Sequence, residues 1–225
     1  MNFMSLYPRS KIPLSVFSLK SVAIDFDDVL FPFTFKFQNW CKKHHGLQGH
    51  PREKIKSPNF RDVFQCEYDI SKKIFDDLTE TIPNTLWEEF HLLDDSQTDE
   101  MDEIFEYLKQ IKESGIDLFI VTARTEQYSF NITIKYCNKY FPGIFTDFFF
   151  CNTFASTSAI KRTKADICKK YNISVLVDDS LENIAKVKED NIIGIPFGNN
   201  PWTQSSETVK TWEDLIVCLK YIFIL

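Results

Sequence analysis

Pairs of aspartates follow two apolar runs that lie far apart in the sequence. Asp25 and Asp27 come directly after the run 22–24, and Asp178 and Asp179 end a second such run. If the chain stays extended past the first run, the side chains of Asp25 and Asp27 point to the same side of it. Carboxylates held this close repel one another, so a cation is expected between them. A hard divalent ion that prefers oxygen ligands, such as Mg²⁺, is the natural candidate.

Groups that could bind an anion stand at comparable places. Thr122 ends the apolar run 117–122 and is followed by a predicted helix start, where the first N–H groups have no partners within the helix. Lys164 opens a helix predicted over 163–171, with Thr163 as its N-cap. Acids for a metal, together with a hydroxyl, an ammonium and N–H donors for an anion, suit phosphoryl transfer. In that reaction, positioning and charge neutralisation supply most of the catalysis.

Each of these groups also has a structural interpretation. Aspartates after a strand often cap the next helix or solvate a turn. Lys161 and Arg162 compete with Lys164 for the anion, although a place at the helix start directs Lys164 toward the strand ends. Arg124 would form a local salt bridge or contact a substrate, with the structural role favoured. We expect Asp28 to accept hydrogen bonds rather than to bind a metal.

The hydrophobic pattern predicts how these residues come together. Strands that alternate with helices indicate a three-layer, Rossmann-like α/β fold with a parallel sheet. The carboxyl ends of parallel strands lie along one edge, where ligands bind. The strands are expected at 20–25, 117–122, 145–151, 173–177 and 192–196. The helices are expected at about 32–45, 71–80, 85–93, 99–114, 123–140, 163–171, 181–188 and 212–219.

A mostly helical insert is predicted after the first strand. It contains a loop at 46–59, and Gly46 is expected to end the helix before that loop. Its aromatic residues could stack on a base or another flat group, but aromatic residues at helical spacing more often pack in a core. The candidates are Phe31, Phe33, Phe35 and Phe37. The predicted division is a core domain of 1–30 and 97–225 and a cap of 31–96.

Composition excludes several classes of function. The chain has 225 residues, enough for one sizeable domain with an insert, and its net charge of −6 offers no basic field for a nucleic-acid polymer or an anionic membrane. The six cysteines are scattered without a Cys-x-x-Cys pair, which favours reduced, buried thiols in the cytosol. No run is long enough to span a membrane, and residues 1–20 lack the apolar core of a signal peptide. The histidines show no metal-ligand pattern and are expected at the surface or at caps; they are His44, His45, His50 and His91.

Four segments, in order, resemble the four motifs of the haloacid dehalogenase-like (HAD) phosphatase superfamily. They are 24–29 (Ile-Asp-Phe-Asp-Asp-Val), 120–124 (Ile-Val-Thr-Ala-Arg), Lys164 and 176–180 (Leu-Val-Asp-Asp-Ser). The match covers most of the chain outside the insert, and in this superfamily an insert after the first strand is a cap over the site. Within the superfamily, the sequence further resembles the 5'(3')-deoxyribonucleotidase-like branch. The segments that show this resemblance are Asp27-Asp28-Val29, Thr122-Ala123-Arg124, the segment 164–168, Asn200-Pro201-Trp202 and the segment 209–214.

The resemblance implies a role for each matched residue. Asp25 would attack phosphorus and become an aspartyl-phosphate. Asp27 would protonate the leaving oxygen and then take a proton from the hydrolytic water. Mg²⁺ would be held by Asp25, the backbone carbonyl of Asp27 and the carboxylate of Asp179. Asp178 would support these ligands without touching the metal, or the two aspartates would exchange roles. The phosphoryl oxygens would be bound by Thr122, Ala123 and Lys164.

The residues and the resemblance together predict a cytosolic, Mg²⁺-dependent phosphomonoesterase. Its expected partner is a small-molecule phosphate ester, with a nucleoside monophosphate as the leading substrate. The alternative among enzymes is a phosphatase for a sugar phosphate or a phosphoprotein. The alternative outside enzymes is a non-catalytic binding protein of the same fold, which is disfavoured because every catalytic position holds a competent residue. The oligomeric state is left open.

Overall fold

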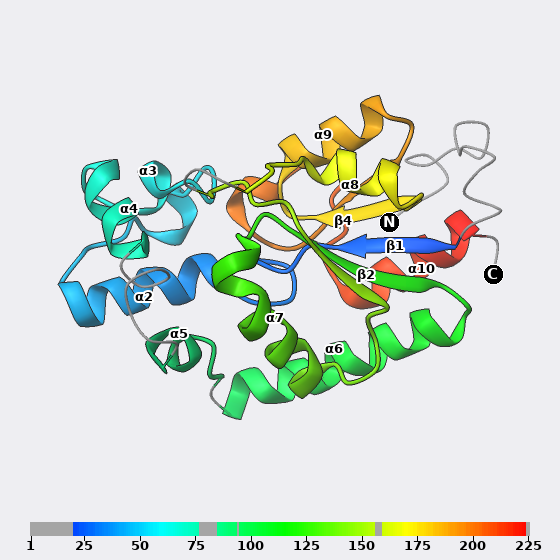
Figure 1. Ribbon diagram of the computed structural model, residues 1–225, viewed down its shortest axis with the longest axis horizontal. Helices are drawn as coiled ribbons and strands as arrows, with labels where there is room; N and C mark the ends of the chain where they lie inside the picture. Colours follow the sequence, from blue (N-terminus) through cyan, green and yellow to red (C-terminus); the bar gives the residue numbers. More distant parts are fainter. Residues whose placement is uncertain (1–19, 77–84, 94, 156–158, 224–225) are drawn as a thin grey trace.

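A parallel sheet with the strand order β3-β2-β1-β4-β5 forms the centre of the chain (Figure 1). The computed structural model describes residues 20–76, 85–93, 95–155 and 159–223. The strands of the described sheet are β1 (Ser21–Ile24), β2 (Asp117–Thr122), β3 (Asp147–Phe150), β4 (Val175–Asp178) and β5 (Ile193–Pro196). Each is apolar and short, as expected for strands that are covered on both faces. The predicted three-layer, parallel α/β fold is confirmed.

The two faces of the sheet are read directly from β1. Val22 and Ile24 belong to one hydrophobic cluster, and Ala23, which points the other way, belongs to a second. Helices α8 (Lys164–Lys170) and α9 (Leu181–Glu189) cover the face of Ala23, and α6 (Asp95–Glu113), α7 (Glu126–Tyr140) and α10 (Trp212–Phe223) bury their apolar residues in the other cluster (Figure 1).

The segment between β1 and α6 is largely helical, as predicted. It lies beyond the carboxyl end of β1 (Figure 1). Gly46 ends its first helix with a φ of 64°, in the left-handed conformation that glycine adopts without strain. The described elements are α2 (Phe33–His45), η3 (Arg52–Lys54), α3 (Phe60–Val63), α4 (Tyr68–Asp76) and α5 (Thr85–Phe90). The turn η3 lies within the predicted loop, and residues 77–80 of the helix predicted at 71–80 lie outside the described residues.

The insert and the sheet share one hydrophobic core. Phe31, Phe37 and Phe64 from the insert belong to the same buried cluster as Phe26 and Ile104. The division of the chain into a core domain and a cap therefore stays a prediction, since the apolar interior runs across the predicted boundary.

One helix begins later than predicted, at a place that matters for the site. α7 starts at Glu126 rather than at Ala123, and Thr125 before it is extended, with φ −85° and ψ 121°. The backbone N–H of Arg124 donates to Oγ1 of Thr122 at 3.2 Å instead of continuing a helix. Residues 123–125 are therefore a loop at the end of β2, and Arg124 projects from it.

All six cysteines are unpaired, and all except Cys66 are buried. Among the described residues, no helix is long and apolar enough to cross a membrane.

Candidate active site

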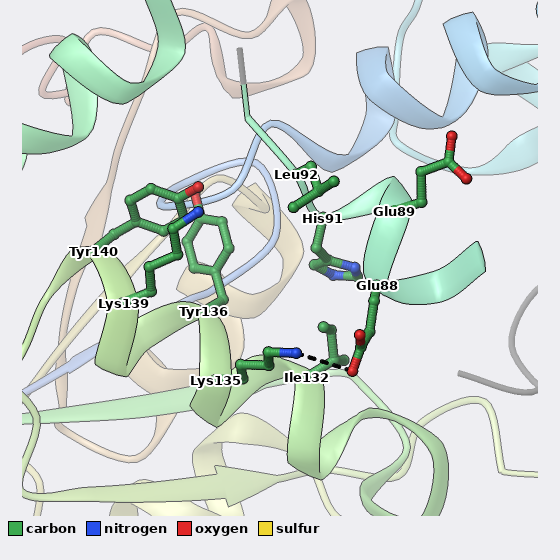
Figure 2. A pocket seen from close by; sticks show the side chains of 9 residues that line it. All are labelled: Glu88, Glu89, His91, Leu92, Ile132, Lys135, Tyr136, Lys139 and Tyr140. Carbon is green, nitrogen blue, oxygen red and sulfur yellow. Dashed lines mark ion pairs between the residues drawn. The ribbon is translucent and has the colours of Figure 1, made fainter. Parts of the chain in front are cut away.

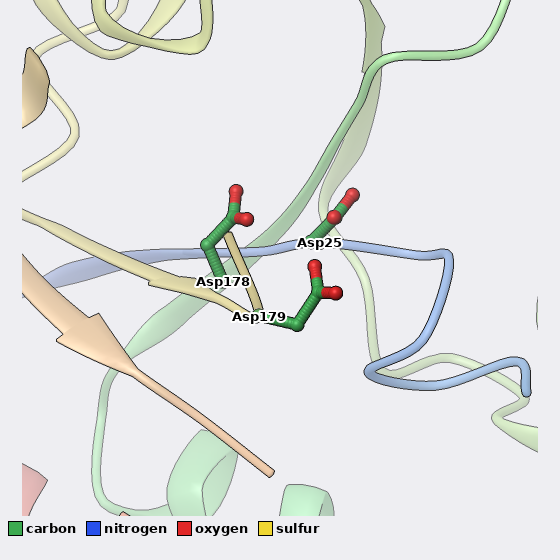
Figure 3. Close-up of side chains that lie close together, drawn as sticks. All are labelled: Asp25, Asp178 and Asp179. Atoms are coloured by element: carbon green, nitrogen blue, oxygen red, sulfur yellow. The ribbon is translucent and has the colours of Figure 1, made fainter. Parts of the chain in front are cut away.

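Three buried carboxylates gather at the carboxyl ends of β1 and β4 (Figure 3). Ile24 of β1 lies opposite Val177 of β4, so the next residues, Asp25 and Asp178, lie side by side at the carboxyl ends of the two strands. One oxygen from each of Asp25, Asp178 and Asp179 lies within 4.8 Å of the others. Three carboxylate oxygens this close are a donor set that fits a hard divalent cation.

A buried lysine lies against this cluster. Nζ of Lys164 is 2.7 Å from Oδ2 of Asp25 and 2.7 Å from Oδ2 of Asp178. The helix start that places it is fixed by a capping box: Oγ1 of Thr163 accepts from N of Asp166 at 3.0 Å, and N of Thr163 donates to Oδ2 of Asp166 at 2.9 Å. Of the basic residues that the sequence left in competition, Lys161 and Arg162 are exposed and Lys164 is the one at the acids.

The cluster carries more negative charge than one ammonium offsets. Burial raises the pKa of Asp25 well above its usual value; Lys164 opposes the shift, and the other acids add to it. Burial likewise raises the pKa of Asp179, with Asp178 adding to the shift. Burial alone would lower the pKa of Lys164, but Asp178 and Asp25 raise it, so the lysine stays charged. A second cation would relieve the remaining repulsion, which again fits a divalent metal.

Thr122 ends the strand next to β1, and Ala123 is the first residue of the loop that follows. Thr122 is fully buried, and its hydroxyl accepts the N–H of Arg124 as described above. Ala123 is half-buried, and its carbonyl accepts from N of Thr153 at 3.2 Å. Both residues lie at the edge of the sheet where the acids emerge, and their binding of a phosphoryl group stays a prediction.

Asp27 lies outside the carboxylate cluster, contrary to the simple geometric expectation. The chain does not stay extended past Asp25, because it bends at Phe26, between the two aspartates. The carboxylate of Asp27 is instead held by Arg124, with Nε 2.8 Å from Oδ2 and Nη2 2.7 Å from Oδ1. The salt-bridge interpretation of Arg124 is thus confirmed, and its partner is the predicted general acid.

Arg124 is packed from the insert as well as from the core. Its Nη2 lies 3.0 Å from Nε2 of His91, and its Nη1 donates to Oγ1 of Thr133 at 3.1 Å. The guanidinium also lies 4.4 Å from the ring centroid of Phe26. The surface interpretation of His91 is wrong, because this side chain is buried and stacks on Phe31 with ring centroids 4.6 Å apart.

Asp28 accepts hydrogen bonds, as predicted. Its carboxylate accepts from N of Thr34 at 2.9 Å and also from the Thr34 hydroxyl, so it ties the turn after β1 to the start of α2. Burial raises the pKa of Asp28 to about 7, although the bonds from Thr34 oppose the shift.

No role was predicted from the sequence for residues 200–203, which contact the chain segments that follow β1 and β4. Nε1 of Trp202 donates to Oδ2 of Asp179 at 2.5 Å, and the Thr203 hydroxyl donates to the Asp179 carbonyl at 2.8 Å. Nδ2 of Asn200 donates to the carbonyl of Asp28 at 3.2 Å. The Asn-Pro-Trp sequence was visible as part of a resemblance, but no local signal indicated its partners.

The aromatic candidates for substrate stacking are mostly interior. Phe31 and Phe37 are fully buried in the hydrophobic core, which does not fit a role in stacking on a ligand. Phe33 is half-buried and packs on Phe37 with ring centroids 5.6 Å apart. The core interpretation therefore describes Phe31 and Phe37.

A pocket of about 240 Å³ lies between α5 and α7 (Figure 2). Lys135 and Glu88 form an ion pair across it, with Nζ 3.1 Å from Oε1. His91 forms part of its wall and also contacts Arg124, which in turn binds Asp27, and none of the three clustered acids lines the pocket. It is a cavity beside the acids rather than the carboxylate site itself.

Solved structures share this arrangement of strands and helices. A haloacid dehalogenase-like family hydrolase from Streptococcus pneumoniae matches with a TM-score of 0.54 and 10% identity, covering 89% of this chain and 98% of the other. The fold is that of the haloacid dehalogenase-like hydrolases. A provisionally assigned phosphoglycolate phosphatase from Lactobacillus delbrueckii subsp. bulgaricus gives a TM-score of 0.54 and 15% identity, with 89% and 98% coverage. A predicted phosphatase from Clostridium acetobutylicum matches with a TM-score of 0.50 and 15% identity, covering 92% of this chain and 99% of the other. No protein-family model matches the sequence, and no curated protein matches it.

Proposed function

We propose that this protein is a phosphomonoesterase that acts through an aspartyl-phosphate on Asp25. One observation carries the proposal: Nζ of Lys164 lies 2.7 Å from the carboxylate of Asp25, inside a buried cluster with two further acids. An aspartate beside a fixed ammonium and a potential cation site can approach an anionic phosphate without the repulsion that a lone carboxylate meets. The phosphatase names of the proteins with this fold support the same reaction.

The reaction has two steps, and both use residues described above. In the first, a carboxylate oxygen of Asp25 forms a bond to phosphorus while the bond to the ester oxygen breaks, and Asp27 gives that oxygen a proton, which requires that Asp27 enters the step protonated and with one oxygen released from Arg124. In the second, water attacks phosphorus, Asp27 takes a proton from the water, and the bond to Asp25 breaks. Inorganic phosphate is thereby released, and the carboxyl groups of Asp25 and Asp27 return to their starting states. Lys164 and Thr122 bind the phosphoryl oxygens throughout.

The carboxylates fit Mg²⁺ as the cofactor. Asp25, Asp179 and the backbone carbonyl of Asp27 would hold it, and it supplies positive charge to the phosphoryl oxygens when bound. Asp178 is a less suitable ligand than Asp179, because its two oxygens are held by three donors: Nζ of Lys164, N of Ser180 at 2.9 Å and Nδ2 of Asn183 at 3.3 Å. We therefore assign Asp179 as the direct ligand and Asp178 as the residue that fixes Lys164.

The substrate is a small phosphate ester. A nucleoside monophosphate was the first expectation, but the burial of Phe31 and Phe37 removes two of the rings that would have stacked on a base. A small ester without a base, such as a sugar phosphate or phosphoglycolate, is the second candidate, and the likeness to the phosphoglycolate phosphatase from Lactobacillus delbrueckii supports it. The unpaired cysteines are in keeping with the reducing cytosol.

A phosphate-release assay tests the proposal. The purified full chain is given nucleoside monophosphates, sugar phosphates, phosphoglycolate and a phosphopeptide, each with Mg²⁺ and with EDTA. Release that needs Mg²⁺ supports the function, and the preferred ester identifies the substrate class. No release from any ester, with the protein folded by circular dichroism, would favour a non-catalytic binding protein.

A further inference from the structure

Trp202 contacts Asp179, the last of the three clustered acids along the chain. It belongs to the turn η5 (Pro201–Thr203), between β5 and α10, and it is buried. The indole N–H is a donor only, and it donates to Oδ2 of Asp179 at 2.5 Å. The ring is held on its other side by the insert, where Phe35 of α2 lies with its centroid 6.0 Å away.

Asp179 depends on this turn for its orientation. Its carbonyl accepts the Thr203 hydroxyl at 2.8 Å, and Thr203 is fully buried. Its neighbour Asp178 differs, because both oxygens of Asp178 are bound by groups from α8 and the start of α9. Among the described residues, only Trp202 binds a side-chain oxygen of Asp179, and the other oxygen has no hydrogen-bond partner there.

We infer that Trp202 is a positioning residue for the metal site: its indole N–H holds one oxygen of Asp179 and leaves the other for a divalent cation. Partners that fix a ligating carboxylate in this way tune metal affinity strongly, even though they never touch the metal. The inference rests on the proposed metal-dependent phosphatase, and it adds a residue from the end of the chain to that site.

The test measures Mn²⁺ binding to the full chain in the absence of substrate, with electron paramagnetic resonance as the readout. Trp202→Phe keeps an aromatic ring and removes the donor, and we expect it to weaken Mn²⁺ binding about tenfold or more. Trp212→Phe is the matched control, because Trp212 packs on Phe197 with centroids 4.7 Å apart and, among the described residues, its indole N–H donates to none of the three clustered acids. The control should bind Mn²⁺ like the wild type.

A second variant separates the hydrogen bond from the packing. Benzothienylalanine at position 202 has the shape of tryptophan with sulfur in place of the N–H. It should weaken Mn²⁺ binding to the same extent as Trp202→Phe, because it keeps the packing of the ring and loses only the donor to Asp179. Wild-type affinity in that variant, or a wild-type chain that binds no Mn²⁺, would overturn the inference. Phosphate release is not part of this measurement, so an absence of turnover would count against the proposed function alone.

Discussion

Arg124 binds Asp27 through two parallel hydrogen bonds, Nε to Oδ2 at 2.8 Å and Nη2 to Oδ1 at 2.7 Å. The arginine comes from the loop after β2 and the aspartate from the turn after β1, so the direction of Asp27 is set by a neighbouring strand. The guanidinium is buried, whereas the side chain of Asp27 is 24% exposed. Asp27 is thus the accessible member of the pair, and Arg124 is the fixed one.

Replacing the guanidinium of Arg124 by a single ammonium should impair general acid catalysis by Asp27 more than it impairs the other steps of the reaction. Arg124→Lys keeps the charge but loses the paired geometry, and we expect kcat/KM for an alkyl phosphate to fall roughly 100-fold, the lower end of the range for general acid catalysis. p-Nitrophenyl phosphate has a good leaving group that needs little protonation, so its kcat/KM should fall far less. An equal fall for both esters would mean that Arg124 is structural only. Arg162→Lys, at an exposed arginine, is the control.

Asp25→Asn should abolish turnover without unfolding the protein. The amide cannot form the acyl phosphate, so phosphate release from every ester should fall to background. Burial and the neighbouring acids raise the pKa of Asp25, which means that its ionised form destabilises the folded state at neutral pH. The melting temperature of the metal-free variant should therefore equal or exceed that of the wild type. Asp117→Asn, at the exposed start of β2, should leave turnover intact.

Lys164→Met should cost both stability and activity. It leaves Asp25 and Asp178 buried without their ammonium, and breaking such a pair typically costs about 3–5 kcal/mol. We expect a lower melting temperature by thermal unfolding, and Mg²⁺ should raise it more in the variant than in the wild type, because a cation at the acids replaces part of the lost charge. If Mg²⁺ shifts both proteins equally, the lysine and the metal do not share these carboxylates. Lys161→Met, which changes an exposed lysine, serves as the comparison.

Local sequence signals predicted the elements and the residues that those elements carry directly. The apolar runs gave the strands that end at Asp25 and Asp178, and an N-cap at Thr163 placed Lys164 at a helix start. These inferences depend only on neighbours along the chain. The bend at Phe26, which separates Asp27 from the cluster, has no such signal, and neither has the turn that follows it, because aspartate at the φ of 60° seen at Asp28 is uncommon.

The contacts that orient the acids could not be predicted in the same way. Arg124 and Asp27 are 97 positions apart, and Trp202 and Asp179 are 23 apart. Each contact depends on strand order and on the path of a loop, which the alternation of polar and apolar residues does not determine. His91 illustrates the same limit, because nothing in its flanking sequence indicates that it is buried against an arginine.

The helix start at Lys164 can be tested through its capping box. Thr163→Ala removes an N-cap, which typically costs about 1 kcal/mol, and it should also loosen the placement of the adjacent lysine. The hydrogen bonds from Thr163 lower the pKa of Asp166, so the stability they provide is present above the usual aspartate pKa. It is lost as the pH falls through the lower pKa of the folded state. Urea unfolding should therefore show a stability difference between wild type and Thr163→Ala that is constant from pH 7 to pH 5 and shrinks toward pH 3. A difference that grows on acidification would contradict the capping role of Asp166.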